Sequence, residues 1–400
     1  MENKKLRSII KGESITHVED IVISQIEQYS DGIIIFGCSS TGKLVLEELE
    51  ELGIKPLCFC DDVETEKNNE YHGYMVLSSQ QTKDLYKEKN VGVILCVNHI
   101  DQFNMVKKQL NDLGFLEFID KDLVLFSHKQ RMLKQLNIKQ PENNEYKNDG
   151  LDIVFDKIEF NITAHCTLKC RDCCQLLYLT KKMGHSDTEL TKTSILEFSK
   201  VIDYCALVEV FGGEPLIYPN LYEILDTTSK IENILEVVVD TNGTVMPQDN
   251  ILELMANRRI AMRVTDYGEL STQKYKIKDA CDKFGVPCTI IKVGIWNIYG
   301  KAEISSYTDH EKKFHTCVSA NKCSSLIEGK WHVCARNAHL TRIGMLRDNE
   351  EEYMNFLDEN MSYEQKRIKM NGLLLRKEPL SSCQYCNGSD NLSMGGIQFE

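Results

Sequence analysis

The sequence predicts an α/β protein in three parts: a doubly wound parallel sheet, a partial barrel of parallel strands and a small cysteine-rich domain. Short apolar runs alternate with helical patterns along residues 32–120, and the same alternation returns along residues 151–310. This alternation is typical of parallel strands that are joined by crossover helices. From residue 311 the alternation is lost and five of the sixteen cysteines follow, which indicates a third, smaller unit.

The bulk composition is that of a globular protein with more than one domain. The chain has 400 residues, of which 42% are hydrophobic and 27% are charged, and a single core rarely grows to that length. The net charge of −13 argues against a nucleic-acid partner, because binding to phosphates needs an excess of Lys and Arg. No apolar run is long enough for a signal peptide or a membrane span. We therefore expect a cytoplasmic protein with reduced thiols, so clustered cysteines favour metal over disulfides.

Residues 1–128 are expected to form the doubly wound domain, which begins with a helix in "HVEDIVISQIEQYS". A buried strand at 33–36 leads into the glycine turn "GCSSTG" and then into a helix with leucines at helical spacing. The polar segment 129–150 is expected to be a linker. Further alternating elements are expected at 92–98, 101–113 and 115–120.

The turn "GCSSTG" (37–42) stands where a dinucleotide-binding fold carries G-x-G-x-x-G, and Asp61 follows at the end of the next strand. The middle position is Ser39, whose Cβ would crowd a pyrophosphate, so a nicotinamide site is disfavoured. The domain resembles Rossmann-like modules attached to enzymes of nucleotide-sugar and surface-polysaccharide biosynthesis. The resemblance implies a nucleotide-sugar or another phosphorylated ligand near Thr41, and a purely structural or dimerising role stays open.

Residues 151–310 are expected to form a partial (β/α)6 barrel of the TIM type. Its strands end in polar residues or glycine, and such folds place their chemistry at these carboxyl ends. After a first strand in "VFDKIEFNITAHC", the next four expected strands lie within 207–215, 234–243, 259–268 and 285–294.

The first expected strand runs into "CTLKCRDC", which has the spacing C-x3-C-x2-C at Cys166, Cys170 and Cys173. Three thiolates can hold three corners of a [4Fe–4S] cube and leave the fourth iron open, whereas zinc knuckles usually offer two C-x2–4-C pairs or added histidines. Cys174 is too close to Cys173 to be an easy fourth ligand. From the triplet alone, an iron–sulfur cluster, zinc and packed apolar thiols all remain open.

The motifs that follow the triplet, taken in their order along the chain, favour the iron–sulfur cluster over zinc or packed thiols. "GGEP" follows the second expected strand and "TNG" follows the third, and with the cysteine triplet they make the chain resemble the radical S-adenosylmethionine (SAM) enzymes over about residues 151–300. The resemblance implies that Cys166, Cys170 and Cys173 bind a [4Fe–4S] cluster whose open iron binds SAM. One departure is Asp172, which stands where the family usually has an aromatic residue near adenine. The implied SAM contacts are Gly212, Gly213 and Glu214 for the amine, and Asp240, Asn242 or Thr265 for the ribose or carboxylate.

The cysteines after residue 311 resemble the C-terminal extension of the SPASM/twitch subgroup, which carries auxiliary clusters. No cysteine follows the C-x2-C pair, so the single-cluster twitch form fits better. The alternative is a zinc site, since C-x2-C with two distant cysteines is also found in zinc ribbons. The implied ligands are Cys317, Cys334, Cys383 and Cys386, with Cys323 as the spare that could replace one of them.

These expectations combine into an enzyme with two [4Fe–4S] clusters and SAM. The resemblance implies a 5′-deoxyadenosyl radical that abstracts hydrogen from a carbon of a small molecule, such as a sugar, nucleotide-sugar or polyol, which is then oxidised or rearranged. It also implies an external one-electron donor such as flavodoxin or ferredoxin. Two alternatives are a radical SAM maturase of a ribosomally made peptide and a non-catalytic, zinc-stabilised nucleotide-binding module.

Overall fold

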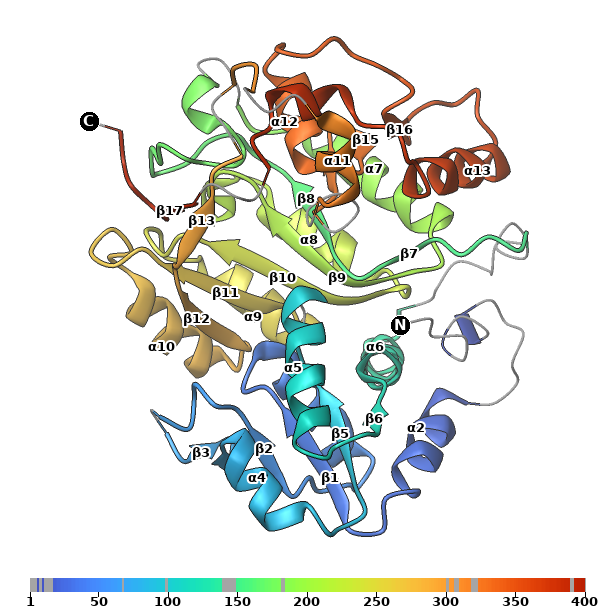
Figure 1. Cartoon of the computed structure of the whole chain (residues 1–400), viewed down its shortest axis with the longest axis vertical. Coiled ribbons are helices and arrows are strands. Elements are labelled where there is room, and N and C mark those ends of the chain that lie inside the picture. Colours follow the sequence, from blue (N-terminus) through green and yellow to red (C-terminus); the bar gives the residue numbers. More distant parts are fainter. Residues whose placement is uncertain are drawn as a thin grey trace. The chain divides into compact units, whose positions relative to one another are not determined.

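The computed structural model describes most of the chain in two compact units, residues 1–143 and 144–400. We describe each unit by itself (Figure 1). No helix in the described part of the chain has both the length and the apolar character that crossing a membrane requires. The described residues are 6, 9–10, 17–66, 68–97, 100–138, 149–180, 184–299, 302–305, 309–317, 323–388 and 392–399.

Unit 1 contains the expected doubly wound sheet. Its strand order is β3-β4-β2-β1-β5-β6, and the pairs β4–β2, β2–β1, β1–β5 and β5–β6 are parallel. The first strand, β1, is therefore central: β2, β4 and β3 lie on one side of it, and β5 and β6 lie on the other, as in a doubly wound sheet. The strands are β1 (Gly32–Phe36), β2 (Cys58–Cys60), β3 (Glu70–Tyr71), β4 (Tyr74–Leu77), β5 (Val91–Leu95) and β6 (Phe118–Ile119). The helices are α2 (Val18–Ile26), α3 (Ser40–Glu51), α4 (Ser79–Tyr86), α5 (Ile100–Asp112) and α6 (Lys121–Gln135).

The expected start of the linker at residue 129 lies inside helix α6, so that boundary is corrected. Met132 and Leu133 are buried in this helix. Arg131 donates to the buried carboxylate of Glu48 on α3 through Nε at 3.0 Å and Nη2 at 3.1 Å. These contacts hold the polar segment as a helix to Gln135, and the later part of the expected linker, 139–148, lies outside the described residues.

Unit 2 is built on a nine-stranded sheet with the order β12-β11-β10-β9-β8-β14-β15-β16, in which β7 pairs with β9. The strands from β8 to β12 are parallel, as in a partial barrel, and β14 extends them in parallel beside β8. The cysteine-rich segment thus contributes strands to the barrel sheet. The strands are β7 (Val154–Phe155), β8 (Ile158–Asn161), β9 (Tyr204–Phe211), β10 (Ile234–Thr241), β11 (Ala261–Asp266), β12 (Cys288–Lys292), β14 (Ser325–Ile327), β15 (Lys330–His332) and β16 (Tyr353–Asn355).

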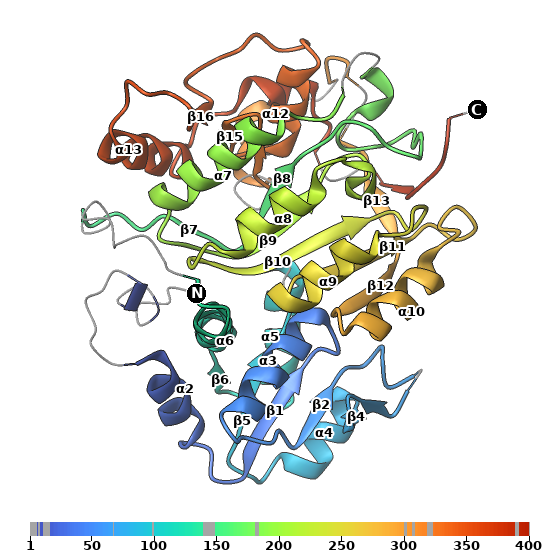
Figure 2. The same ribbon diagram turned by 180° about the vertical axis from the view of Figure 1, so that it is seen from behind.

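Four helices cover one face of this sheet, as seen from behind in Figure 2. They are α7 (Thr188–Val201), α8 (Leu221–Ser229), α9 (Asp249–Arg258) and α10 (Lys274–Phe284). The main core lies between these helices and the sheet, where the buried ring of Phe198 packs against the rings of Phe155, Phe160 and Phe356. The opposite, inner face of the sheet carries polar side chains and leads to the cysteine loop. The remaining elements are α11 (His310–His315), α12 (Ala335–Arg342), α13 (Tyr363–Leu374) and the strand pair β13 (Ile295–Asn297) and β17 (Leu392–Met394).

Candidate functional site

The three cysteines of the triplet lie on the loop that follows β8. Burial, together with the neighbouring Glu214, Cys173 and Cys170, raises the pKa of the Cys166 thiol to about 11. Burial likewise raises the pKa of Cys170 and of Cys173. The three thiols therefore lie close to one another. Because their pKa values are raised, a cationic group such as a metal would be needed for all three to ionise.

Several N–H groups already point at these sulfur atoms. The Sγ of Cys166 accepts from the backbone N–H of Leu168 at 3.5 Å and lies 3.6 Å from Nδ2 of Asn242. The Sγ of Cys170 accepts from Nε2 of Gln398 at 3.2 Å. Hydrogen bonds to sulfur are among the features that set the reduction potential of a protein-bound cluster.

The turn "GGEP" packs directly on the start of the cysteine loop. Gly212 has φ +150°, and a Cβ on Gly213 would lie 1.9 Å from the carbonyl oxygen of His165. The backbone N–H groups of Gly213 and Glu214 donate to the carbonyls of Thr163 and His165, both at 2.8 Å. The close backbone approach that requires glycine here is therefore made with the chain's own loop.

The carboxylate of Glu214 joins the ends of two strands. It is fully buried, and it accepts from the backbone N–H of Asn242 at 2.8 Å and of Leu216 at 3.0 Å. Burial raises its pKa to about 7, while these two N–H groups act in the opposite direction. Both oxygens are thus already hydrogen-bonded within the chain, and the expected contact with a methionine amine stays a prediction.

Asn242 lies beside the cysteine loop, whereas Asp240 is held elsewhere. Asn242 donates from Nδ2 to Oγ1 of Thr167 at 2.9 Å. The carboxylate of Asp240 is bound by Arg263 on β11, with Nη2 at 2.6 Å. The backbone carbonyl of Thr265 accepts from Ser271 at 3.0 Å. The structure thus brings Glu214 and Asn242 to Cys166 and gives Asp240 a partner on the inner face of the sheet.

The C-terminal tail holds the cysteine loop in a way that the sequence analysis missed. Gln398 pairs with Cys170 as an antiparallel bridge, and its Oε1 accepts from the backbone N–H of Lys169 at 2.7 Å. The backbone N–H of Arg171 donates to the Ile397 carbonyl at 2.7 Å, and that of Phe399 donates to the Lys169 carbonyl at 2.9 Å. No sequence motif predicts these contacts, because main-chain hydrogen bonds between residues more than two hundred positions apart leave no local pattern in the sequence.

The four implied ligands of the second cysteine set lie near one another. Burial is the largest cause that raises the pKa of Cys334 and that of Cys383, the latter to about 11, and both are raised further by Cys317 and Cys386. The ammonium of Lys313 donates to the carbonyl of Cys383 at 2.9 Å and also to the carbonyl of Cys386. The C-x2-C turn is thereby fixed, and whether the four thiols hold a cluster or zinc stays a prediction.

Cys323 faces a different environment. Burial raises its pKa to about 11, Lys157 acts in the opposite direction, and Glu159 and Glu209 raise the pKa further. Cys317 also raises this pKa, and the carbonyl of Cys323 accepts from the backbone N–H of Ala335, the neighbour of Cys334, at 2.8 Å. Cys323 thus lies near the acids of the inner face and near the second cysteine set.

The glycine turn of unit 1 is filled by the chain's own carboxylate. Asp61 accepts from the backbone N–H of Cys38 at 2.9 Å, and Ser39 caps helix α3 by accepting from the N–H of Gly42 at 3.2 Å. A Cβ on Gly42 would lie 2.2 Å from the carbonyl oxygen of Gly37. The N–H that a phosphate would use is therefore occupied by an anion, which disfavours a phosphate at this turn.

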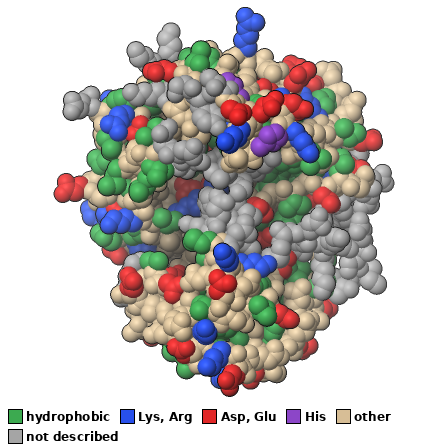
Figure 3. Space-filling model, viewed as in Figure 1, with side chains coloured by type: hydrophobic (Ala, Val, Ile, Leu, Met, Phe, Trp, Pro, Cys, Tyr) green, Lys and Arg blue, Asp and Glu red, His purple; other side chains and the backbone are tan. Residues whose placement is uncertain are grey.

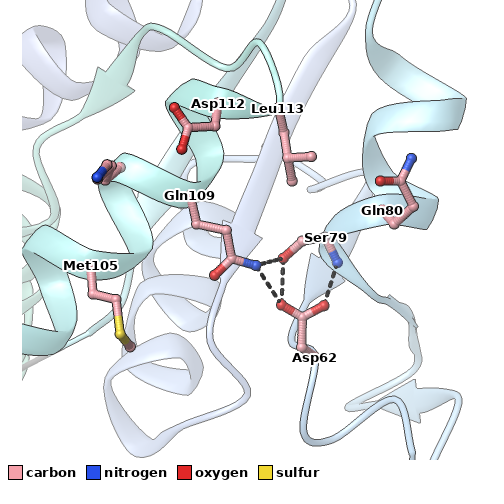
Figure 4. Close-up of a pocket in the computed structure, with 8 residues that line it drawn as sticks. Asp62, Ser79, Gln80, Met105, Gln109, Asp112 and Leu113 are labelled. Carbon is pink, nitrogen blue, oxygen red and sulfur yellow. Dashed lines mark hydrogen bonds between the residues drawn. The ribbon is translucent and has the colours of Figure 1, made fainter.

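A separate cavity of unit 1, of about 450 Å³, lies between helices α4 and α5. At its edge Asp62 accepts from the hydroxyl of Ser79 at 2.6 Å, and Gln109 donates to Asp62 at 3.1 Å (Figure 4). These polar groups bond to one another, and the rest of the lining includes the charged side chains of Lys108 and Asp112. On the face of the molecule in Figure 3, acidic and basic side chains of the described residues are interspersed.

Comparison with known proteins identifies the central part of the chain. Residues 160–278 match the model of the Radical SAM superfamily. The chain contains a radical SAM domain. The enzymes of this superfamily use a [4Fe–4S] cluster and SAM.

The individual relatives match this chain over short stretches. A GTP 3′,8-cyclase of Clostridium acetobutylicum is 29% identical over 98 residues, which are 23% of this chain and 29% of that protein. The antilisterial bacteriocin subtilosin biosynthesis protein AlbA of Bacillus subtilis is 37% identical over 101 residues, which are 24% of this chain and 20% of AlbA. The chain thus spans less than a third of either relative. Among solved structures, BtrN in complex with AdoMet and 2-DOIA has a TM-score of 0.40 and 16% identity, with 60% of this chain and 95% of BtrN covered.

The residues of the radical SAM domain fit the superfamily's cluster. In the described part of the chain, no three His, Cys, Asp or Glu side chains converge closely enough to hold a single metal ion. A cube instead places each thiolate on a different iron, so its ligands stand further apart. Cys166, Cys170 and Cys173 supply three such thiols, and their N–H partners suit sulfur that carries negative charge.

Proposed function

We propose that the chain is a radical SAM enzyme that oxidises a carbon centre of a small, hydroxyl-rich molecule such as a sugar or polyol. With Cys166, Cys170 and Cys173 as ligands, the bound cluster would supply the electron that splits SAM into methionine and a 5′-deoxyadenosyl radical. The chain's own part is to hold the loop through Gly213, Glu214 and the C-terminal tail, and to orient the substrate away from water. An external one-electron donor belongs to this proposal.

The second cysteine set is the observation that favours oxidation. Removal of a hydrogen atom takes one electron from the substrate, and conversion of an alcohol to a ketone needs a second electron and the hydroxyl proton to leave. Four thiols, Cys317, Cys334, Cys383 and Cys386, would ligate every iron of an auxiliary cluster and leave none for substrate. Such a closed cluster is suited to accept the second electron, whereas an isomerase needs no acceptor.

Anaerobic purification followed by a labelling assay tests this proposal. Two cubes would give brown protein with about 7 to 8 irons per chain, whereas colourless protein that carries zinc would favour the non-catalytic binding module. The reduced enzyme is then incubated with SAM and C-deuterated sugars, polyols and nucleotide-sugars. We expect deuterium in 5′-deoxyadenosine and a ketone product, and SAM cleavage without transfer from any member of these classes would contradict the substrate assignment.

A second candidate is the modification of a ribosomally made peptide. It is favoured by the 37% identity over 101 residues with AlbA, a bacteriocin biosynthesis protein. The same assay distinguishes it, because deuterium would then be transferred from a labelled peptide and from none of the sugars.

A further inference from the structure

The inner face of the barrel sheet carries an apolar cluster and, beside it, a group of charged side chains that we call the charged layer. Leu207, Val238 and Ala261 form a buried apolar cluster across β9, β10 and β11. Side chains alternate along a strand, so the residues two positions further on share this face. In all three strands that next residue is charged: Glu209, Asp240 and Arg263.

The charged layer is tied together by ion pairs. Arg263 donates through Nε and Nη2 to Asp240, with Nη2 at 2.6 Å, and Nη2 also bonds to Glu209. On the other side of Glu209, the ammonium of Lys157 donates to Oε2 at 2.8 Å. The Lys157 side chain remains 15% exposed and that of Arg263 24% exposed, so neither side chain is fully enclosed.

The layer continues onto β8 and β14. Glu159 is the register partner of Glu209 on one side and of Ser325 on the other. The hydroxyl of Ser325 donates to Oε2 of Glu159 at 2.9 Å and accepts from Nδ2 of Asn161 at 3.2 Å. Asn161 is 2% exposed, and within the described residues its buried Oδ1 has no hydrogen-bond partner.

A purely structural role does not account for this arrangement. Buried ion pairs seldom stabilise a fold more than aliphatic side chains of similar volume, and other positions on the same face of these strands hold Leu, Val and Ala. The charges also lie close to the candidate site, because Asp240 precedes Asn242, which lies beside Cys166, by two residues. An unsatisfied buried oxygen at Asn161 is a further sign of a missing partner.

We propose that this layer recognises the substrate and selects a hydroxyl-rich ring that is uncharged or carries an amino group, and that it rejects a phosphate ester. The inference rests on the proposed function and names the substrate class of the same site. Lys157 and Arg263 would donate to ring hydroxyl oxygens, while Glu159 and Asn161 would accept from hydroxyl or ammonium groups. The layer holds three carboxylates against two cations, and both cations are already paired with carboxylates. An added phosphate would meet this acid excess at short range.

Calorimetry on the holoenzyme tests this selection without turnover. The iron-loaded full chain is titrated anaerobically, with SAM present and no reductant, with glucose, glucosamine and glucose 6-phosphate. These probes differ in the charge of one substituent. We expect glucose and glucosamine to bind, glucosamine more tightly, and glucose 6-phosphate to give no heat. Binding of the phosphate as tight as that of glucose, or no binding of any probe, would overturn the proposal.

Matched variants connect the selection to the layer. Glu159→Gln should reduce the affinity for glucosamine about tenfold and bring it near that of glucose, because one charge-assisted hydrogen bond is lost. Glu253→Gln on the exposed face of α9 is the control and should leave both affinities unchanged. An unchanged glucosamine affinity in folded Glu159→Gln would also overturn the assignment.

The two proposals can fail separately. If SAM is cleaved on reduction while no probe binds, the charged layer has been misassigned and the radical function stands. If glucosamine binds and SAM is never cleaved, the radical function has been misassigned and the substrate recognition by the charged layer stands.

Discussion

Replacement of Gln398 should loosen the cluster loop from a position that is more than two hundred residues away in sequence. Its side chain donates from Nε2 to Sγ of Cys170 at 3.2 Å and to the carbonyl of Gly396 at 2.7 Å. Its Oε1 accepts from the backbone N–H of Lys169 at 2.7 Å. Gln398→Ala therefore removes two hydrogen bonds that join the tail to the loop, and one that lies within the tail.

The size of the effect follows from these contacts. Each hydrogen bond contributes about 1 kcal/mol net, so loss of the two bonds to the loop should favour the open loop by about 2 kcal/mol. Gln398→Glu keeps the acceptor for Lys169 but places a carboxylate beside Cys170. Repulsion between two charges near 4 Å is roughly 1 to 4 kcal/mol at a protein surface, so Glu should be at least as disruptive as Ala to an iron-bound thiolate.

Release of iron to a chelator measures this change directly. Anaerobically reconstituted protein is mixed with a ferrous chelator, and the release rate should rise between about tenfold and a hundredfold in both variants. Ser393→Ala, also in the tail, is the matched control, because within the described residues its hydroxyl donates to the carbonyl of the neighbouring Met394 and not to the cysteine loop. Release from Gln398→Ala at the wild-type rate would refute a role for the tail in holding the loop.

The remaining predictions concern both cysteine sets, one turn and unit 1. Cys170→Ala should abolish reductive SAM cleavage, measured as 5′-deoxyadenosine, and cleavage at the wild-type rate would dismiss the assigned loop. Cys383→Ala should keep most cleavage but block the ketone product; an unchanged product yield would remove the electron-acceptor role. Gly213→Ala should lower the urea midpoint markedly, since its Cβ would lie 1.9 Å from the carbonyl of His165; an unchanged midpoint would contradict the tight packing. UDP-glucose should bind the full chain no more weakly when Thr41 is replaced by Ala, because Asp61 fills the nearby turn; calorimetry showing weaker binding would restore a phosphate site there.

Local patterns were sufficient to predict most of the strands and the position of the cysteine loop. Parallel strands that are buried on both sides read as continuous apolar runs, as in Ile234–Thr241 before "NG". The carboxyl ends of such strands meet at one edge of the sheet, so the order of the triplet, "GGEP" and "TNG" predicted that they lie together. The contact of Asn242 with the Cys166 loop agrees with that prediction.

The features that the sequence did not reveal depend on distant partners. The second half of helix α6 has the polar sequence of a linker. Its Arg131 forms an ion pair with the buried carboxylate of Glu48, a distant partner that the local sequence does not show. The position of Asp240 at a strand end suggests a contact with SAM, but its carboxylate is bound by Arg263 on the next strand. The register between two strands cannot be seen in the sequence of a turn. Strand β14 is three residues long, too short to show a period, and its pairing with β8 ties the cysteine-rich segment to the barrel.

The chain joins the ends of three strands to one another through its own backbone and side chains, and this bears on how the site would load its cofactors. Gly213 is bonded to Thr163 after β8, Glu214 joins the end of β9 to Asn242 after β10, and Asn242 reaches back to Thr167 on the cysteine loop. These bonds close a ring of contacts around Cys166 that needs no bound group. Ordering a flexible loop on binding costs about 1 kcal/mol or more per residue, so a loop that is already tied gains affinity. The buried carboxylate of Glu214 therefore has a structural role in joining the ends of β9 and β10. If it changed hydrogen-bond partners on binding, the contacts around Cys166 would be lost.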